Sequence, residues 1–446
     1  MYKKIIDKLK NKKIAILGFG REGKSTYKFI RKYLPEMVLY ILDKNNIDLD
    51  DKNVIKIIGD SYLDNMDSYD YIIKSPGISF NNIDISSYKD KITSQLELLL
   101  EIFKDNIIGI TGTKGKSTTS SLIYEVIRNQ RDNVYLIGNI GIPVFDDIEK
   151  YNKDSILVIE MSSHQLEFVH VSPHIGIILN LYEEHLDHDG TLEKYHHNKL
   201  NIFKYQNKDD YAIYSSDNIY LNKYMNNSIY KGIKYTVRFD YNDFTDNSIR
   251  IKDKDIYIDK DIVYHDDKRL LIGDGNLNNI MFVLGVCKIL GLDYYKTKDV
   301  ISNFKGLKYR MEYIGKYHDI NFYNDTIATI PEATINAINS IKNVDTLILG
   351  GMDRGINYDK LILFLNNSSI NNFICMPDTG NYIGNKLINK NIFYVDNLED
   401  AVDISLKCTL KDKSCLLSPA AASYNKYKNF EEKGLIFENI VKSIKN

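Results

Sequence analysis

The chain has 446 residues, of which 43% are apolar and 26% charged, values typical of globular rather than disordered or fibrous proteins. This length exceeds what one hydrophobic core supports, so we expect about two to four domains. The formal net charge of −2 gives no general attraction to nucleic acid or to an anionic membrane, and it indicates neither as a partner.

The four cysteines form no CxxC pair and are too few for a disulfide framework, which favours a reduced protein. The N-terminal segment lacks the apolar stretch of a signal peptide. No segment approaches the roughly 20 apolar residues that a membrane-spanning helix needs. We therefore expect a cytoplasmic protein that does not bind a membrane.

The first segment of the chain has the pattern of a βαβ unit. A β-type run, a glycine turn and a predicted helix are followed by two more apolar runs, which indicates an α/β fold with a parallel sheet. The expected elements are a strand over 13–17, a helix over 24–32, a strand over 38–42 and a strand over 71–74.

The glycine turn reads Gly18-Phe-Gly20-Arg-Glu-Gly23 and fits GxGxxG, a dinucleotide-binding pattern. Asp43, about 20 residues after the last glycine, favours NAD. The pattern alone is weak, because a turn with no ligand or a nucleotide diphosphate site would use the same glycines. No residues for hydride transfer can be identified. The Ser75-Pro-Gly77 turn could close the same pocket from the side.

The second and third segments repeat the alternation of strands and helices. Continuous apolar strands indicate a parallel sheet covered on both faces, and short alternating runs over 236–272 predict antiparallel hairpins. The other expected elements are strands over 106–110, 156–160 and 175–179, helices over 117–128 and from near Asn276, and, after Gly306, strands over 345–349 and 372–376.

The strongest local signal is the stretch Gly109-Ile-Thr-Gly112-Thr-Lys-Gly115-Lys116-Ser-Thr118 between a strand and a helix. Backbone N–H groups of such a loop and the helix N-terminus bind phosphate oxygens. Lys116 can reach the β- and γ-phosphates, and a following hydroxyl can bind Mg²⁺. The strict GxxxxGK[ST] pattern is not met, because Ile110 stands in place of its first glycine.

Two acidic stretches follow buried strands. Glu160 ends one strand, where either a Mg²⁺-directed carboxylate or a solvated acid is expected. The stretch 180–189, rich in His and acids, is either a metal site or a polar loop, and zinc is disfavoured because no cysteine or His pair has structural-zinc spacing. Lys199, considered by itself, would be an ordinary surface lysine.

Taken in order, these motifs resemble the Mur ligase family over the whole chain. The phosphate loop places the chain in the wider family, which includes folylpolyglutamate synthases. Members that add glutamate are singled out by Ser162-Ser-His-Gln165-Leu-Glu167 and by the long stretch 417–434. The resemblance implies a UDP-binding Rossmann-like domain over 1–95, a central P-loop ATPase domain with a mostly parallel sheet over 96–304, and a Rossmann-like amino-acid-binding domain over 305–446.

The resemblance also implies an activity. It predicts an ATP-dependent ligase of cytoplasmic peptidoglycan synthesis that phosphorylates the carboxylate of UDP-N-acetylmuramoyl-L-alanine and passes the acyl group to D-glutamate. ATP, Mg²⁺ (two ions) and a monomeric protein are expected. The alternatives are an L-glutamate-adding variant, an NAD-dependent dehydrogenase and a non-catalytic nucleotide-binding protein on the same scaffold.

Motif by motif, the resemblance implies roles for individual residues. Those expected in catalysis are Lys116, Glu160, His185 and Lys199. Those expected at ATP are Gly112, Thr113, Lys114, Gly115, Lys116, Ser117, Thr118, Asn276, Arg310 and Asp325. Those expected at the UDP substrate are Gly18, Arg21, Glu22, Asp43, Ser75, Gly77, Asn139, Ser162, Gln165 and His185. Those expected at the amino acid are Thr329, Arg354, Ser423, Tyr424 and Phe430. The Mg²⁺ ligands expected are Ser117, Glu160, His185 and Lys199, the last carbamylated by CO₂.

Two departures concern the amino-acid site. Many family members read DSKATN where this chain has Asp325-Thr-Ile327-Ala-Thr329-Ile, so a lysine of that site is replaced by Ile327. The lysine of the Gly-Gly loop is replaced by Arg354, whose planar guanidinium binds carboxylates bidentately. The resemblance implies that both changes lie at the site that reads the amino acid, so they bear on its contacts and on the choice between D- and L-glutamate.

Overall fold

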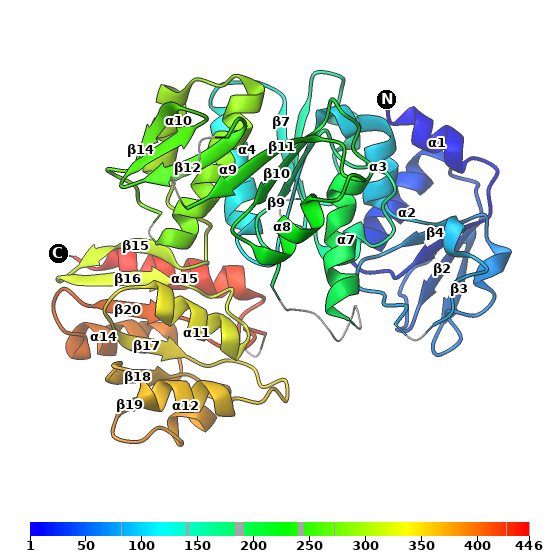
Figure 1. Cartoon of the computed structure of the whole chain (residues 1–446). Helices are drawn as coiled ribbons and strands as arrows, with labels where there is room; N and C mark the ends of the chain where they lie inside the picture. Colours follow the sequence, from blue (N-terminus) through cyan, green and yellow to red (C-terminus); the bar gives the residue numbers. More distant parts are fainter. Residues whose placement is uncertain are drawn as a thin grey trace. The chain divides into compact units, whose positions relative to one another are not determined.

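The computed structural model describes residues 1–81, 83–139, 142–182, 191–239, 245–271, 273–424 and 426–445. The chain forms two compact units, Met1–Phe304 and Lys305–Asn446. The first contains a five-stranded and a nine-stranded sheet, and the second a six-stranded sheet (Figure 1). The predicted mixed α/β class with mostly parallel strands is confirmed. No helix among the described residues is long and apolar enough to cross a membrane.

The N-terminal sheet has the order β3-β2-β1-β4-β5, and all its neighbouring strands are parallel. Its elements are α1 (Lys3–Leu9), β1 (Ile14–Leu17), α2 (Arg21–Tyr33), β2 (Leu39–Asp43), β3 (Val54–Ile58), β4 (Tyr71–Lys74) and β5 (Ile92–Thr93), followed by α3 (Gln95–Phe103). Strand β3 was not predicted, although Val54–Ile58 reads Val-Ile-Lys-Ile-Ile. As an edge strand it buries none of these residues fully.

The central sheet has the order β14-β13-β12-β11-β10-β9-β6-β8-β7. Pairs from β7 to β12 are parallel, whereas β12, β13 and β14 form the predicted antiparallel hairpins. The elements are β6 (Ile107–Thr111), α4 (Lys116–Arg128), β7 (Val134–Gly138), β8 (Ile156–Glu160), α5 (Ser163–Leu166), β9 (Ile175–Ile178), α7 (Leu192–Lys204), β10 (Tyr211–Ser215), α8 (Ile219–Met225), β11 (Ile233–Arg238), β12 (Ser248–Lys252), β13 (Asp255–Ile258), β14 (Asp261–His265), α9 (Asp274–Leu290) and α10 (Tyr294–Asn303).

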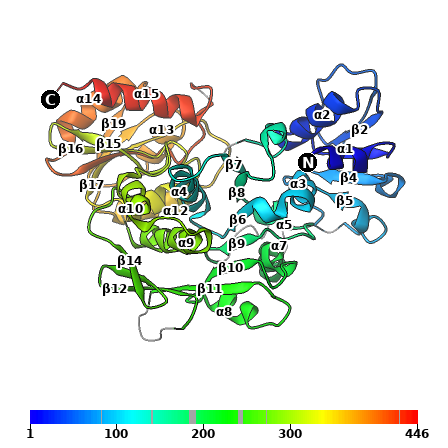
Figure 2. The same ribbon diagram turned by 90° about the horizontal axis from the view of Figure 1, so that it is seen from above.

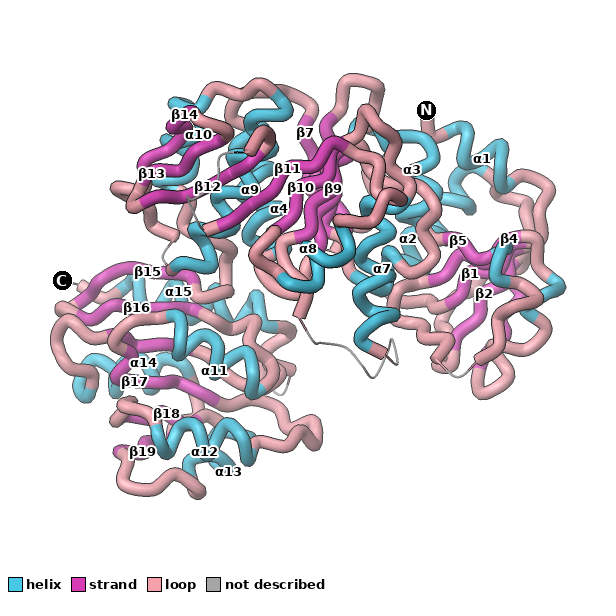
Figure 3. The backbone as a smooth tube through the Cα atoms, in the orientation of Figure 1, coloured by secondary structure: helices cyan, strands magenta, loops and turns pink. Residues whose placement is uncertain are grey.

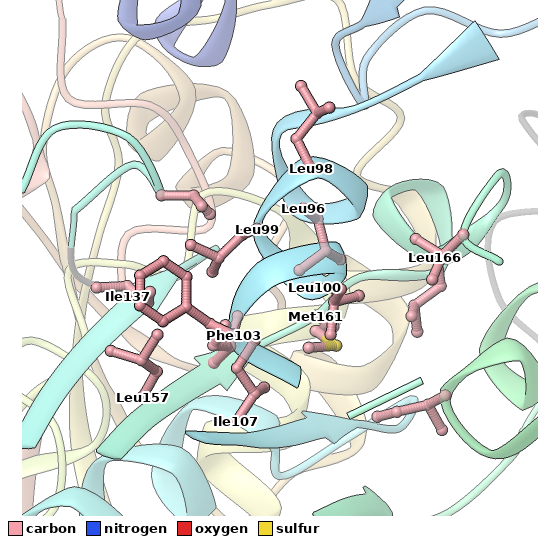
Figure 4. Close-up of a cluster of buried hydrophobic side chains, with 14 of the residues drawn as sticks. Leu96, Leu98, Leu99, Leu100, Phe103, Ile107, Ile137, Leu157, Met161 and Leu166 are labelled. Atoms are coloured by element: carbon pink, nitrogen blue, oxygen red, sulfur yellow. The ribbon is translucent and has the colours of Figure 1, made fainter. Parts of the chain in front are cut away.

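Both faces of the central sheet are covered, as continuous apolar strands predict. Helices α4, α9 and α10 pack with Ile108 on one face (Figure 2), while α3, α5, α7 and α8 pack with Ile107 on the other. The residues of α3 lie in one apolar cluster with strands of both sheets of this unit, including Ile16 and Leu157. Figure 4 shows the leucines of α3 beside the central strands.

The second unit is a six-stranded sheet of order β15-β16-β20-β17-β18-β19, parallel except for the β15–β16 pair. Helices α11, α12 and α13 cover one face, and α14 and α15 the other (Figure 3). The elements are β15 (Glu312–Tyr317), β16 (Ile320–Asn324), α11 (Pro331–Ser340), β17 (Val344–Leu349), α12 (Asp359–Asn367), β18 (Asn372–Cys375), α13 (Thr379–Gly384), β19 (Asn391–Tyr394), α14 (Leu398–Cys408), β20 (Ser414–Leu417) and α15 (Phe430–Ser443).

The glycine turn after β1 depends on close backbone contact. Gly18 has φ +87°, and a Cβ added at Gly23 would lie 2.0 Å from the carbonyl oxygen of Gly18. The first turn of α2 can therefore rest on the turn only if residue 23 has no side chain.

We expect Gly23→Ala to lower the free energy of unfolding by about 1–3 kcal/mol through overpacking, despite the roughly 1 kcal/mol that alanine gains in a helix. Gly20→Ala is the matched control, since a Cβ at Gly20 meets nothing within 4 Å. Urea unfolding of both variants checks this. Equal stability of the two would show that the turn tolerates a side chain.

Candidate active site

The predicted phosphate loop connects β6 to α4. Gly112 and Gly115 have φ of +152° and +86°, a region that favours glycine. Helix α4 begins at Lys116, so Ser117 and Thr118 lie in its first turn, where backbone N–H groups have no partner within the helix. The loop and the helix N-terminus therefore offer the donors that bind a phosphate.

The side chain of Asn180, directly after β9, holds this loop. Its Oδ1 accepts hydrogen bonds from the backbone N–H groups of Thr113 (3.0 Å) and Lys114 (2.9 Å), and its Nδ2 donates to the carbonyl of Lys114 (3.1 Å). This role of Asn180 was not predicted. Its position after a parallel strand next to β6 could have indicated that it lies beside the phosphate loop.

Two lysines lie at the loop. The Nζ of Lys116 donates to the carbonyls of Gly112 (2.8 Å) and Thr113 (2.9 Å). Lys199, on α7 and only 2% exposed, donates to the carbonyl of Gly112 (3.2 Å) and to Oγ1 of Thr111 (3.5 Å). The surface position that its local sequence alone favoured is therefore wrong.

The neighbours of Lys199 on α7 include a tyrosine and a histidine. The Nζ lies 4.7 Å from the ring centroid of Tyr195, whose hydroxyl is 3.2 Å from Oγ1 of Thr113. Burial, and to a smaller extent the charges of His197 and Lys199, lowers the pKa of His196 to about 4. His196 is therefore neutral near pH 7 and adds no positive charge here.

Glu160 ends β8 and pairs with Ile110 of β6, which brings its carboxylate to the loop. The side chain is 1% exposed, and Oε1 accepts a hydrogen bond of 2.6 Å from Nδ2 of Asn139. Oε2 is buried with no hydrogen-bond partner among the described residues. An unsatisfied buried carboxylate oxygen is costly, so this donor set fits a cation such as Mg²⁺.

The remaining predicted metal ligand, His185, lies outside the described residues. Within the described part of the chain, no three His, Cys, Asp or Glu residues gather as a metal site. Asn276 lies in the first turn of α9, and its Oδ1 accepts a hydrogen bond of 3.1 Å from Nδ2 of Asn279. A Cβ on Gly115 would lie 2.6 Å from Oδ1 of Asn279, so this end of α9 adjoins the phosphate loop.

Two helices of the first unit, α2 and α5, are linked by residues predicted at the UDP substrate. Ser162 and Gln165 form a capping box at the start of α5. Nε2 of Gln165 donates to Oε1 of Glu22 at 2.7 Å. Burial raises the pKa of Glu22, against the lowering effect of the Gln165 hydrogen bond and of the Lys74 charge.

Asp43 has a structural partner. Its carboxylate accepts hydrogen bonds from the N–H groups of Phe19 (2.7 Å) and Asn45 (2.8 Å). The hydroxyl of Ser75 binds the same glycine turn, since it donates to the Gly18 carbonyl (2.8 Å). Asp43 thus has a structural role in the glycine turn that does not require an NAD ribose. Arg21 and Gly77, also predicted at this substrate, are exposed.

A buried ion network lies beside these residues and was not predicted. Glu167, 5% exposed, lies 3.5 Å from Nζ of Lys74 and 3.1 Å from Nζ of Lys194. The Nζ of Lys74, 3% exposed, also lies 5.8 Å and 5.6 Å from the ring centroids of Phe80 and Phe168. Burial lowers the pKa of Lys74, and Glu167 opposes that shift. The network joins the strand before Ser75, the end of α5 and the helix of Lys199.

The second unit carries the other predicted nucleotide contacts. Asp325, 4% exposed, accepts hydrogen bonds from Ser418 Oγ (2.8 Å) and from the N–H of Met311 (3.1 Å). Burial raises the pKa of Asp325 to about 7, while these bonds and the charge of Arg310 lower it. The carboxyl is thus only partly ionised at neutral pH.

The predicted amino-acid residues also lie in this unit. Nη2 of Arg354 donates to the carbonyl of Thr329 at 3.2 Å. Ser423 is 2% exposed, and its Oγ is buried with no partner among the described residues. Phe430 begins α15 and packs on Tyr309 with ring centroids 6.3 Å apart. Tyr424, by contrast, is 66% exposed.

Comparison with known proteins agrees with this geometry. Residues 110–287 match the Mur ligase middle domain. A UDP-N-acetylmuramoylalanine–D-glutamate ligase of Clostridium botulinum (strain Loch Maree / Type A3) is 32% identical over 464 residues, covering 99% of both chains. The chain belongs to the Mur ligase family. A Mur ligase of the same name from Clostridioides difficile (strain 630) is 33% identical, covering 98% of this chain and all of its own.

Solved Mur ligase structures share the fold. The UDP-N-acetylmuramate–alanine ligase of Thermotoga maritima has a TM-score of 0.56 at 17% identity, covering 98% of this chain and 100% of its own. The MurF ligase of the same organism, in complex with ADP, has a TM-score of 0.55 at 16% identity, covering 96% and 95%. At these identities the likeness concerns the fold alone.

We expect Glu167→Gln to lower the free energy of unfolding by about 3 kcal/mol, because it removes the carboxylate that pairs with the buried Lys74 ammonium. In the double variant Lys74→Met/Glu167→Gln, most of that loss should be recovered. Urea unfolding of the two single variants and the double variant measures the coupling. Losses that simply add would show that the two charges do not interact.

Proposed function

We propose that this chain is an ATP-dependent ligase that joins D-glutamate to the alanine carboxylate of UDP-N-acetylmuramoyl-L-alanine in peptidoglycan synthesis. The observation that carries the proposal is the position of Lys116, Lys199 and Glu160 at one phosphate loop. It is supported by similarity over 99% of the chain to a UDP-N-acetylmuramoylalanine–D-glutamate ligase. We further propose that the reaction takes place in the cytoplasm, where ATP is available, and that the protein is a monomer.

The first chemical step transfers the γ-phosphoryl group of ATP to an oxygen of the alanine carboxylate and releases ADP. A carboxylate is a poor electrophile, and phosphorylation gives it a leaving group. Phosphoryl transfer depends on positioning and on neutralising charge. The loop N–H groups and the Lys116 ammonium serve this purpose, and Asn180 keeps the loop in shape.

In the second step, the amine of glutamate attacks the carbonyl carbon of the acyl phosphate. The new amide bond forms as phosphate leaves, and the amine loses its proton. Thr329, Arg354, Ser423, Tyr424 and Phe430 are proposed to hold the amino acid. The guanidinium of Arg354 takes over charge from the lysine that Ile327 replaces.

Mg²⁺ would be held by Glu160, whose Oε2 has no other partner among the described residues, with Ser117, His185 and Lys199 as further ligands. When bound, it neutralises negative charge on the phosphates. Two ions are proposed.

We propose that Lys199 acts as a carbamate. An ammonium beside divalent cations is repelled, which favours the neutral amine. The amine adds to CO₂ with loss of one proton and becomes an anionic carbamate whose oxygens suit a hard cation. The burial of Lys199 beside the phosphate loop supports this role.

The substrate of the reaction can be tested by ADP release. With UDP-N-acetylmuramoyl-L-alanine we expect turnover with D-glutamate and little with L-glutamate or without an amino acid. Turnover with L-glutamate alone would assign the departures at Ile327 and Arg354 to a change of stereochemistry. Absence of turnover with either would refute the proposed reaction.

Lys199→Ala should lose most activity and regain part of it with added acetate, which supplies the missing carboxylate. Lys199→Arg should remain inactive, because it keeps the charge but cannot form the carbamate. Lys204→Ala, an exposed residue of the same helix, is the control. ADP release measures all three. Full activity of Lys199→Arg would show that the residue works as a cation.

A further inference from the structure

Lys433 of α15 is a buried lysine that the reaction scheme above leaves without a role. The side chain is 1% exposed, and its Nζ donates one hydrogen bond, of 2.8 Å, to the carbonyl of Gly350. The ring centroid of Tyr427 lies 5.7 Å away. Burial lowers the pKa of Lys433 to about 7. No carboxylate among the described residues forms an ion pair with it.

A buried ammonium without a counter-ion destabilises a fold, and an apolar side chain at this position would not carry that cost. The neighbouring Phe437 and Val441 on the same helix are buried apolar residues. A lysine at this position is therefore better explained by what it contacts than by packing.

The contact is with a tightly packed loop, Gly350–Gly355, at the end of β17. A Cβ on Gly350 would lie 2.2 Å from the Met376 carbonyl oxygen, and one on Gly351 would lie 2.3 Å from that of Ala422. The N–H of Met352 donates to the Ala422 carbonyl at 2.8 Å. The loop is thus packed between the end of β18 and the residue that precedes Ser423.

The residues proposed to hold glutamate are on the elements that Lys433 connects. Phe430 begins its own helix, Arg354 is on the loop it binds, and Ser423 follows Ala422. Arg354 in turn binds the carbonyl of Thr329. One side chain therefore joins α15 to the loop beside the other proposed amino-acid residues.

We propose that Lys433 is a positioning residue for the incoming amino acid, which fixes the Gly350–Gly355 loop against α15 and, when protonated, adds positive charge near a dicarboxylate substrate. This rests on the proposed function, which assigns glutamate to these residues. The added charge matters more in this chain because Ile327 has replaced a lysine.

The test compares Lys433→Met, Lys433→Arg and the control Lys442→Met, an exposed lysine of the same helix. In Lys433→Met we expect KM for D-glutamate to rise at least about tenfold, or about 1.4 kcal/mol. KM for ATP and for UDP-N-acetylmuramoyl-L-alanine should stay within about twofold. The melting temperature should hold or rise, since a buried charge is removed.

Lys433→Arg should recover part of the affinity for D-glutamate, because it keeps the charge and a donor for Gly350. An unchanged KM for D-glutamate in Lys433→Met overturns the proposal, as does an equal rise of all three KM values with a lower melting temperature. If Lys433→Met does not fold, Lys433→Gln takes its place under the same criteria. An inactive wild-type enzyme overturns this proposal and the proposed function together.

Discussion

Parallel pairing of β7, β8, β6 and β9 is the constraint on which the candidate site depends. Strands that run in the same direction end at the same edge of a sheet, where α/β proteins bind their ligands. At the ends of these strands, or just after them, lie Asn139, Glu160, the phosphate loop and Asn180. The loop keeps its shape because Asn180, 67 and 66 positions after Thr113 and Lys114, accepts hydrogen bonds from the backbone N–H groups of these two residues.

Local signals in the sequence predicted the elements that surround this edge. The strand 156–160 and the strand 71–74 have the predicted bounds, and the predicted helix after the phosphate loop differs by one residue. The two strands are runs of mostly buried apolar residues, and the helix has a buried apolar face. The apolar run of β3 was not predicted as a strand, and its edge position leaves none of its residues fully buried. Helix α1 was not predicted either, since its few apolar residues lie among lysines.

Contacts between distant segments could not be predicted in the same way. The partners of Glu167 come from residues 74 and 194, and the partner of Lys433 is residue 350. Nothing near either residue in the sequence indicates its burial, and an isolated lysine or glutamate is usually on the surface. A pattern in the sequence can also hide a structural contact. Asp43 fits a ligand-binding pattern, but its carboxylate also accepts a hydrogen bond from the glycine turn beside it.

Helix α3 has a consequence for how this chain could be recombined with others. Leu98, Leu99 and Leu100 are all fully buried, in one cluster with strands of both the N-terminal and the central sheet. A chain cut just before α3 would leave the N-terminal sheet with an uncovered apolar face, and a cut just after it would do the same to the central sheet. The two sheets therefore share one helix, and neither can be separated from the other without exposing apolar side chains to water.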